Sequence, residues 1–200
     1  MTGPFDRDAP DNQTCTRAAS GRPAGAGATT YGTAALQLLD QGYLPLPLRP
    51  GQKSPAVKAW TTVPIDYATV TGWARQFPDH GVGLRCGHLV GLDIDVLDPD
   101  LSFQLCQRTF ERFGEAPLRV GRWPKRLLLY RTEVPFAKIE CGTGKGSKLE
   151  VLGHGQQLVA FGRHPETGSG YFWPLGETRS RSRRTVRASS PTCTQSGSLE

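Results

Sequence analysis

Two aspartates, Asp93 and Asp95, stand one residue apart in an otherwise apolar run near the middle of the sequence. Because they alternate with Leu92, Ile94 and Val96, an extended strand would carry both carboxylates on one face and the aliphatic side chains on the other. The two aspartate Cα atoms would lie roughly 7 Å apart, since a strand rises about 3.3 Å per residue. Carboxylates at this spacing repel each other unless a cation or solvent relieves the repulsion. The chain therefore has to fold around a strand with one apolar and one acidic face.

A divalent cation is one way to relieve this repulsion. Carboxylate oxygens suit Mg²⁺ or Mn²⁺, and these ions complete their coordination shells with water and substrate phosphates. The alternative is a strand that ends in an acidic turn, because Asp98-Pro99-Asp100 follows and Asp is frequent in turns and helix caps. The aspartate pair alone does not decide between a metal site and a turn.

Apolar periodicity and turn residues predict a single α/β (α+β) domain over residues 31–176. Segments 1–30 and 177–200 carry no periodic apolar face and are expected to be disordered. Residues 80–85 and 89–96 are expected to form a hairpin, which would make the acidic strand central in the sheet. The predicted helices are 33–41, 67–77 and 99–113, and the predicted strands are 43–48, 80–85, 89–96, 127–130, 148–152 and 156–161.

The five cysteines are scattered, and no two of them have the CxxC spacing of a zinc ribbon or a redox motif. Their odd number also argues against a disulfide framework. The sequence has no apolar stretch long enough for a signal peptide or a membrane span. We therefore expect a soluble, monomeric cytoplasmic protein that does not contact a membrane.

Positive charge exceeds negative charge by six, and the excess is concentrated in 119–131 and in the Arg/Ser-rich segment 179–187. A polyanionic partner would explain this excess, although solvated basic faces are common. Arg122, Lys125 and Arg126 precede an apolar strand, where they would bind a triphosphate or simply form a basic sheet edge.

Three further residues are candidates on weaker grounds. Lys53 stands in a loop and could be a phosphate ligand or a solvated lysine. His164 follows a buried strand, where it could contact a phosphate or a sugar, or belong to a turn. Glu150 lies between two apolar residues and would supply a third carboxylate. The preceding glycine-rich segment 141–147 does not match a Walker loop and is assigned only a turn.

In this order, the segments resemble the bifunctional DNA primase/polymerase N-terminal (prim-pol) domain of the archaeo-eukaryotic primase superfamily. The resemblance covers residues 31–174. It is carried by Lys53–Pro55, Gly81–Gly83, Gly91–Asp95, Gly121–Tyr130, Leu149–Gly153 and Phe161–Gly168, together with Tyr171 and Trp173.

The resemblance implies a palm-like mixed sheet related to the RNA-recognition fold, in which Asp93, Asp95 and Glu150 match three metal-binding acids. The family usually has a His just before its central strand, where this chain has Lys125-Arg126. Such domains occur in phages, plasmids and integrated elements, and are often joined to a helicase, which would here be a separate partner.

These features together favour template-directed nucleotidyl transfer on single-stranded DNA, with nucleoside triphosphates as substrates and Mg²⁺ or Mn²⁺ as cofactor. Asp93, Asp95 and Glu150 would hold the ions, and Arg122, Lys125, Arg126, His164 and Lys53 would bind the triphosphate. One alternative is a metal-dependent nuclease, which could use the same acids with water as the nucleophile. Another is a catalytically silent module that binds single-stranded nucleic acid.

Overall fold

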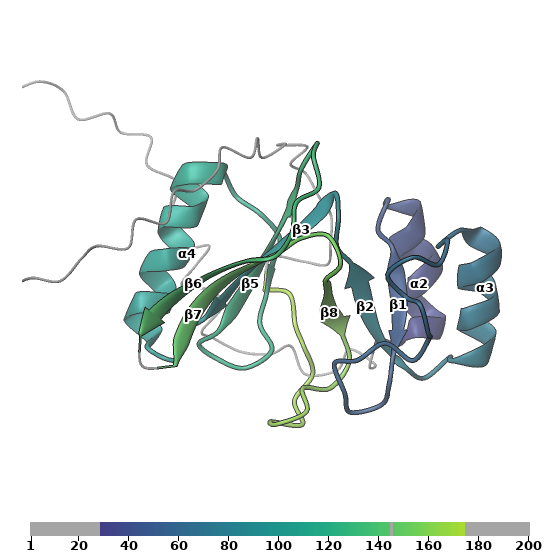
Figure 1. Ribbon diagram of the computed structural model, residues 1–200. Helices are drawn as coiled ribbons and strands as arrows, with labels where there is room; N and C mark the ends of the chain where they lie inside the picture. The colour runs from purple at the N-terminus through teal and green to yellow at the C-terminus, as the bar shows by residue number, and fades with distance from the viewer. Residues whose placement is uncertain (1–28, 145, 175–200) are drawn as a thin grey trace, which may run out of the picture.

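The computed structural model describes residues 29–144 and 146–174. Apart from residues 29 and 30, the predicted disordered segments 1–30 and 177–200 lie outside these residues. The described part of the chain folds into four layers (Figure 1). Helix α4 covers one side of a five-stranded sheet, a three-stranded sheet follows on the other side, and helices α2 and α3 lie beyond it.

All strand pairs are antiparallel, and the strands are divided between two sheets. The helices are α2 (Tyr31–Asp40), α3 (Tyr67–Gln76) and α4 (Pro99–Phe113). The three-stranded sheet has the order β1 (Pro45–Leu48), β2 (Gly81–Arg85), β8 (Gln157–Phe161). The five-stranded sheet has the order β4 (Leu118–Arg119), β5 (Arg126–Arg131), β3 (Leu89–Asp95), β7 (Ser147–Leu152), β6 (Ile139–Gly144).

The predicted α+β class and all three predicted helices are confirmed. The caps account for two helix starts: Asp66 accepts a hydrogen bond from the Thr69 backbone at 2.8 Å, and Asp98 accepts one from Leu101 at 2.9 Å. Gly114 ends α4 with φ +84°, a conformation that glycine adopts without a steric penalty. None of the helices in the described residues is long and apolar enough to cross a membrane.

The predicted hairpin is wrong, because β2 and β3 belong to different sheets. β2 pairs with β1 and β8, whereas β3 pairs with β5 and β7. Between the two strands, the Cys86 N–H donates to the Gln156 carbonyl at 2.9 Å, so the connection leads from one sheet into the other. Pairing with β8 joins residues that are 72 to 79 positions apart in the sequence, which a local pattern cannot reveal. The prediction that the acidic strand is central is nevertheless confirmed, since β3 is the middle strand of five.

The sequence predicts only a turn over 141–147, and this prediction is wrong. Residues 139–144 form the edge strand β6, with Cys141 opposite Leu149 and Gly144 opposite Ser147 on β7. The glycines hid this strand, because glycine lowers strand propensity and removes the side-chain alternation used to recognise one.

The alternation on β3 separates two environments. Leu92 and Ile94 face α4 and are buried with its Cys106 and Phe110. The opposite face of β3 carries Gly91, Asp93 and Asp95. A Cβ on Gly91 would lie 3.0 Å from Leu158 Cδ2, so this glycine lets β8 approach β3 closely. The two sheets therefore pack together at Gly91 and leave room farther along β3, where the aspartates lie.

Candidate functional site

A cavity of about 220 Å³ lies where the two sheets meet, beside the acidic end of β3. It is bordered by β3, the segment between β4 and β5, β8, and the loop that follows β8. Its charged and polar lining consists of Lys53, Asp93, Asp95, Arg119, Arg122, Lys125, Arg126, Gln157, His164, Glu166 and Tyr171. Most of the residues selected from the sequence thus meet in one place, although they come from both sheets.

Asp93 and Asp95 both line this cavity, as the alternation on β3 predicts. Asp93 lies directly across from Glu150 on β7, and Asp95 lies across from Lys148. Burial raises the pKa of the Asp93 carboxyl, and the negative charges of Asp95 and Glu150 act in the same direction. Arg119 and Lys53 oppose the rise without cancelling it. The fold therefore holds Asp93 where its charged form needs a cation.

Glu150 shares a sheet face with Asp93 but does not line the cavity. It is buried, and its two carboxylate oxygens form ion pairs with different lysines, one with Lys138 and the other with Lys148 at 3.0 Å. Burial alone would raise the pKa of Glu150, but the hydrogen bonds from the two lysines outweigh it and the pKa lies below its usual value. The negative charge of Glu150, the third predicted metal ligand, is therefore already balanced by two lysines of the same chain.

Asp93 and Asp95 have the donor chemistry that a hard divalent cation requires, with two carboxylates at the wall of one cavity. Among the residues that the structure describes, no three His, Cys, Asp or Glu side chains already form a metal-binding group. The lysine partners of Glu150 explain why a third ligand is not in place. Asp93 fits the cation as it stands, Asp95 would bind it after leaving Lys125, and Glu150 would join them only after leaving a lysine.

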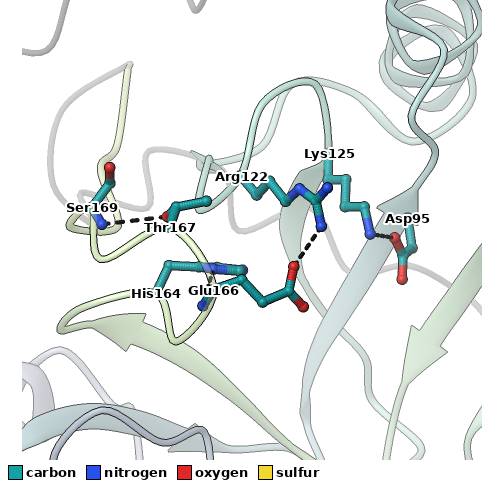
Figure 2. A network of polar contacts seen from close by, with 7 residues as sticks. All are labelled: Asp95, Arg122, Lys125, His164, Glu166, Thr167 and Ser169. Atoms are coloured by element: carbon teal, nitrogen blue, oxygen red, sulfur yellow. Dashed lines mark hydrogen bonds and ion pairs between the residues drawn. The ribbon is translucent and has the colours of Figure 1, made fainter.

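Two cationic side chains of the cavity are held by carboxylates (Figure 2). Lys125 forms an ion pair with Asp95, and Arg122 forms one with Glu166 at 2.5 Å. The Arg122–Glu166 pair links the segment before β5 to the loop after β8, and so joins parts of the chain that adjoin different sheets. A triphosphate would have to displace Glu166 before it could use Arg122, and Lys125 could reach it only after leaving Asp95.

Arg119 and Tyr171 also line the cavity, although sequence reasoning did not select them. The Arg119 guanidinium carbon lies 4.7 Å from the centre of the Tyr171 ring. Arg119 is only 9% exposed, and its Nε has no hydrogen-bond partner among the described residues. Burial lowers the pKa of Arg119, whereas the nearby Asp93 charge favours its cationic form. Arg119 therefore places a buried positive charge at the cavity wall, close to Asp93.

The sequence offers only an indirect signal for Arg119, which is Gly121 two residues later. A Cβ at residue 121 would lie 2.3 Å from Tyr171 Cε1, so only glycine lets the Tyr171 ring pack there. This glycine explains the closeness of the two segments, but it becomes informative only once the contact with Tyr171 is known.

Arg126 differs from the other predicted cations. It lies opposite Ile94 in the register of β5 and β3, on the sheet face that packs against α4. Its guanidinium carbon lies 5.1 Å from the Trp123 ring centre and 5.9 Å from that of Phe103 on α4. Arg126 borders the cavity together with Arg122 and Lys125, but its guanidinium packs on the α4 side of the sheet. The β5 residue across from Asp93 is Leu127.

His164 lies in the cavity wall and is 6% exposed. Its Nδ1 accepts a hydrogen bond from the Glu166 backbone N–H at 3.3 Å, which leaves the proton of the neutral ring on Nε2. Lys53 borders the same cavity, and its backbone carbonyl accepts a hydrogen bond of 2.6 Å from the Gln157 side chain. His164 and Lys53 therefore reach the cavity from the side of the three-stranded sheet.

The environment of His164 should make folding stability depend on pH. Burial lowers the pKa of His164, and the charges of Lys53, Arg119 and Arg122 lower it further, against an opposing effect of Glu166. Between this lowered pKa and the ordinary value of about 6.5, the unfolded chain binds more protons than the folded one, so the free energy of unfolding should rise with pH.

Urea unfolding of the wild type and of His164→Gln at about pH 5 and about pH 8 tests this dependence. The stability of the wild type relative to the variant should increase at the higher pH, because only the wild type loses the unfavourable protonation of His164. A relative stability that stays constant or falls over this interval would contradict the lowered pKa.

In a comparison with family models, the model described as bifunctional DNA primase/polymerase, N-terminal, matches residues 35–186. The match includes both aspartates, Glu150, the cationic segment before β5 and the loop that contains His164. A search of the curated proteins found no match to the sequence.

Proposed function

Because the chain belongs to the Prim-Pol family of bifunctional DNA primase/polymerase N-terminal domains, we propose that it joins nucleotides on a single-stranded DNA template in a reaction that depends on Mg²⁺ or Mn²⁺. The observation that supports this proposal is the arrangement of the cavity. Two carboxylates on β3 face cationic side chains from both sheets across one space. A nucleoside triphosphate with its divalent cation requires both kinds of group.

Asp93 and Asp95 would hold the cation. Bound there, Mg²⁺ or Mn²⁺ would favour ionisation of the primer 3′-hydroxyl and neutralise negative charge on the phosphates. The raised pKa of Asp93 is consistent with this role, because a cation would relieve the repulsion from Asp95 and Glu150. Binding of the cation would thus offset the unfavourable free energy of holding these acids close together.

The triphosphate would bind first at Arg119, Lys53 and His164. Neither Arg119 nor Lys53 forms an ion pair with any described residue, and neutral His164 carries its proton on Nε2, from which it can donate to a phosphate oxygen. Arg122 and Lys125 would add contacts after leaving Glu166 and Asp95. This order places the predicted ligands Arg122 and Lys125 second, and it excludes the guanidinium of Arg126 from the triphosphate.

The test is incubation of the purified protein with short single-stranded DNA templates, ribo- or deoxynucleoside triphosphates, and Mg²⁺ or Mn²⁺. Synthesis of dinucleotides or extension of an annealed primer would support the proposal. Degradation of the strand would instead identify a nuclease, and strand binding that survives without any product would identify a silent binding module. A helicase on another chain could be added to supply single-stranded template from a duplex.

A further inference from the structure

A cluster of four charged residues lies next to the cavity on β6, β7 and the segment before β6. It consists of Lys138, Glu140, Lys148 and Glu150, and we call it the Glu150 cluster. Lys138 contacts Glu150 and also Glu140, the latter at 2.9 Å, while Lys148 contacts the second oxygen of Glu150. Two lysines thus balance two glutamates, and Glu150 is the buried member at the centre.

The register of the sheet places this cluster beside the two aspartates. Glu150 is the cross-strand neighbour of Asp93, and Lys148 is the cross-strand neighbour of Asp95. Side chains paired in this way start from Cβ atoms about 4.5–5.5 Å apart on the same sheet face. A change of side-chain rotamer, without movement of the backbone, would therefore bring the Glu150 carboxylate toward Asp93.

We propose that Lys138 and Lys148 compete with the divalent cation for Glu150 and so set how tightly the site binds metal. This inference rests on the proposed function, in which Asp93 and Asp95 hold the cation. In the absence of metal, the lysines supply the positive charge that Glu150 needs. When the cation binds, Glu150 exchanges a lysine for the metal, and Lys138 and Lys148 act as positioning residues.

Lys138 is the partner that can leave more readily. It already contacts Glu140, so it keeps a carboxylate partner after releasing Glu150. Lys138 is also exposed, so water can solvate its ammonium group during the exchange. Lys148 makes its only ion pair among the described residues with Glu150. The exchange is therefore expected to proceed through Lys138, while Lys148 stays near Glu150.

The test measures Mn²⁺ binding to the full chain by electron paramagnetic resonance of free Mn²⁺, without nucleotide or DNA. Lys138→Met should bind Mn²⁺ at least about fivefold more tightly than wild type, the lower end of ordinary coupling between sites. Glu150→Gln should bind it more weakly than wild type. Because removing any positive charge could attract Mn²⁺, the decisive variant is the double substitution Lys138→Met with Glu150→Gln.

If Lys138 acts through Glu150, the double variant should bind Mn²⁺ as weakly as Glu150→Gln alone. A gain that persists in the double variant, or no gain in Lys138→Met, would overturn the inference. Lys58→Met removes an exposed lysine that does not line the cavity, and it should leave Mn²⁺ affinity unchanged. Circular dichroism confirms that each variant is folded.

The nucleotide-incorporation assay separates the two proposals. Activity together with an unaltered Mn²⁺ affinity in Lys138→Met would overturn the role of the lysines and leave the proposed function standing. Failure of every protein, including Lys138→Met, to bind Mn²⁺ would overturn both the inference and the metal dependence of the proposed reaction.

Discussion

Asp93→Asn should abolish nucleotide incorporation while the protein stays folded. The substitution removes a carboxylate charge that the proposed reaction needs for the cation, but it keeps the size and shape of the side chain. Binding of a cation at a reacting phosphate contributes several kcal/mol, and each 1.4 kcal/mol is a factor of ten in rate. The rate should therefore fall by about a thousandfold or more.

The same substitution should leave the stability of the folded protein unchanged or increase it. Burial and the charges of Asp95 and Glu150 raise the pKa of Asp93, so its ionised form is unfavourable in the folded protein. A neutral amide removes this repulsion, and the melting temperature at neutral pH should stay the same or rise. Loss of activity together with unchanged or greater stability is the pattern expected of a residue that serves function at the expense of folding.

The measurements are primer extension and thermal unfolding of the same preparation. Asp100→Asn is a matched control, because it makes the same chemical change at an exposed position of α4 that does not line the cavity. Incorporation at the wild-type rate by folded Asp93→Asn would rule out the proposed role of this residue. If both variants are folded and lose activity equally, the loss would result from the changed net charge and not from the site.

The local parts of this site could be predicted from the sequence, because they depend on short-range periodicity. Alternation places Asp93 and Asp95 on one face of β3, and the same rule places Glu150 on one face of β7. Asp66 and Asp98 were likewise recognisable as helix caps, since a cap and its partner N–H lie three residues apart.

The parts that depend on how distant segments meet could not be predicted. The sequence 119–126 contains four cationic residues, Arg119, Arg122, Lys125 and Arg126, and nothing local tells which of them faces the cavity. The strand register decides this for two of them. Arg119 lies across from Leu127, which lies across from Asp93 on the cavity face, whereas Arg126 lies across from Ile94, which faces α4. The division of β2 and β3 between two sheets was hidden for the same reason, since β2 pairs with β8, which lies more than seventy residues later in the chain and lines the cavity.

Arg119→Met should raise the nucleotide KM roughly ten- to hundredfold, because a charge-assisted hydrogen bond to phosphate contributes about 1.5–3 kcal/mol. Arg119 lines the cavity and is buried over Tyr171, on the sheet face that carries Asp93.

Arg126→Met is the matched control, since it makes the same change at another buried arginine of the segment 119–126. The Arg126 guanidinium packs against Trp123 and Phe103 on the α4 side, and cation–π contacts are worth about 0.5–2 kcal/mol. This variant should therefore lose stability in urea unfolding while its nucleotide KM changes less than about threefold, equivalent to roughly 0.65 kcal/mol. The two variants should therefore differ in nucleotide KM, which rises strongly only in Arg119→Met. A large rise in KM for Arg126→Met with none for Arg119→Met would place the triphosphate on the α4 side of the sheet, away from Asp93 and Asp95.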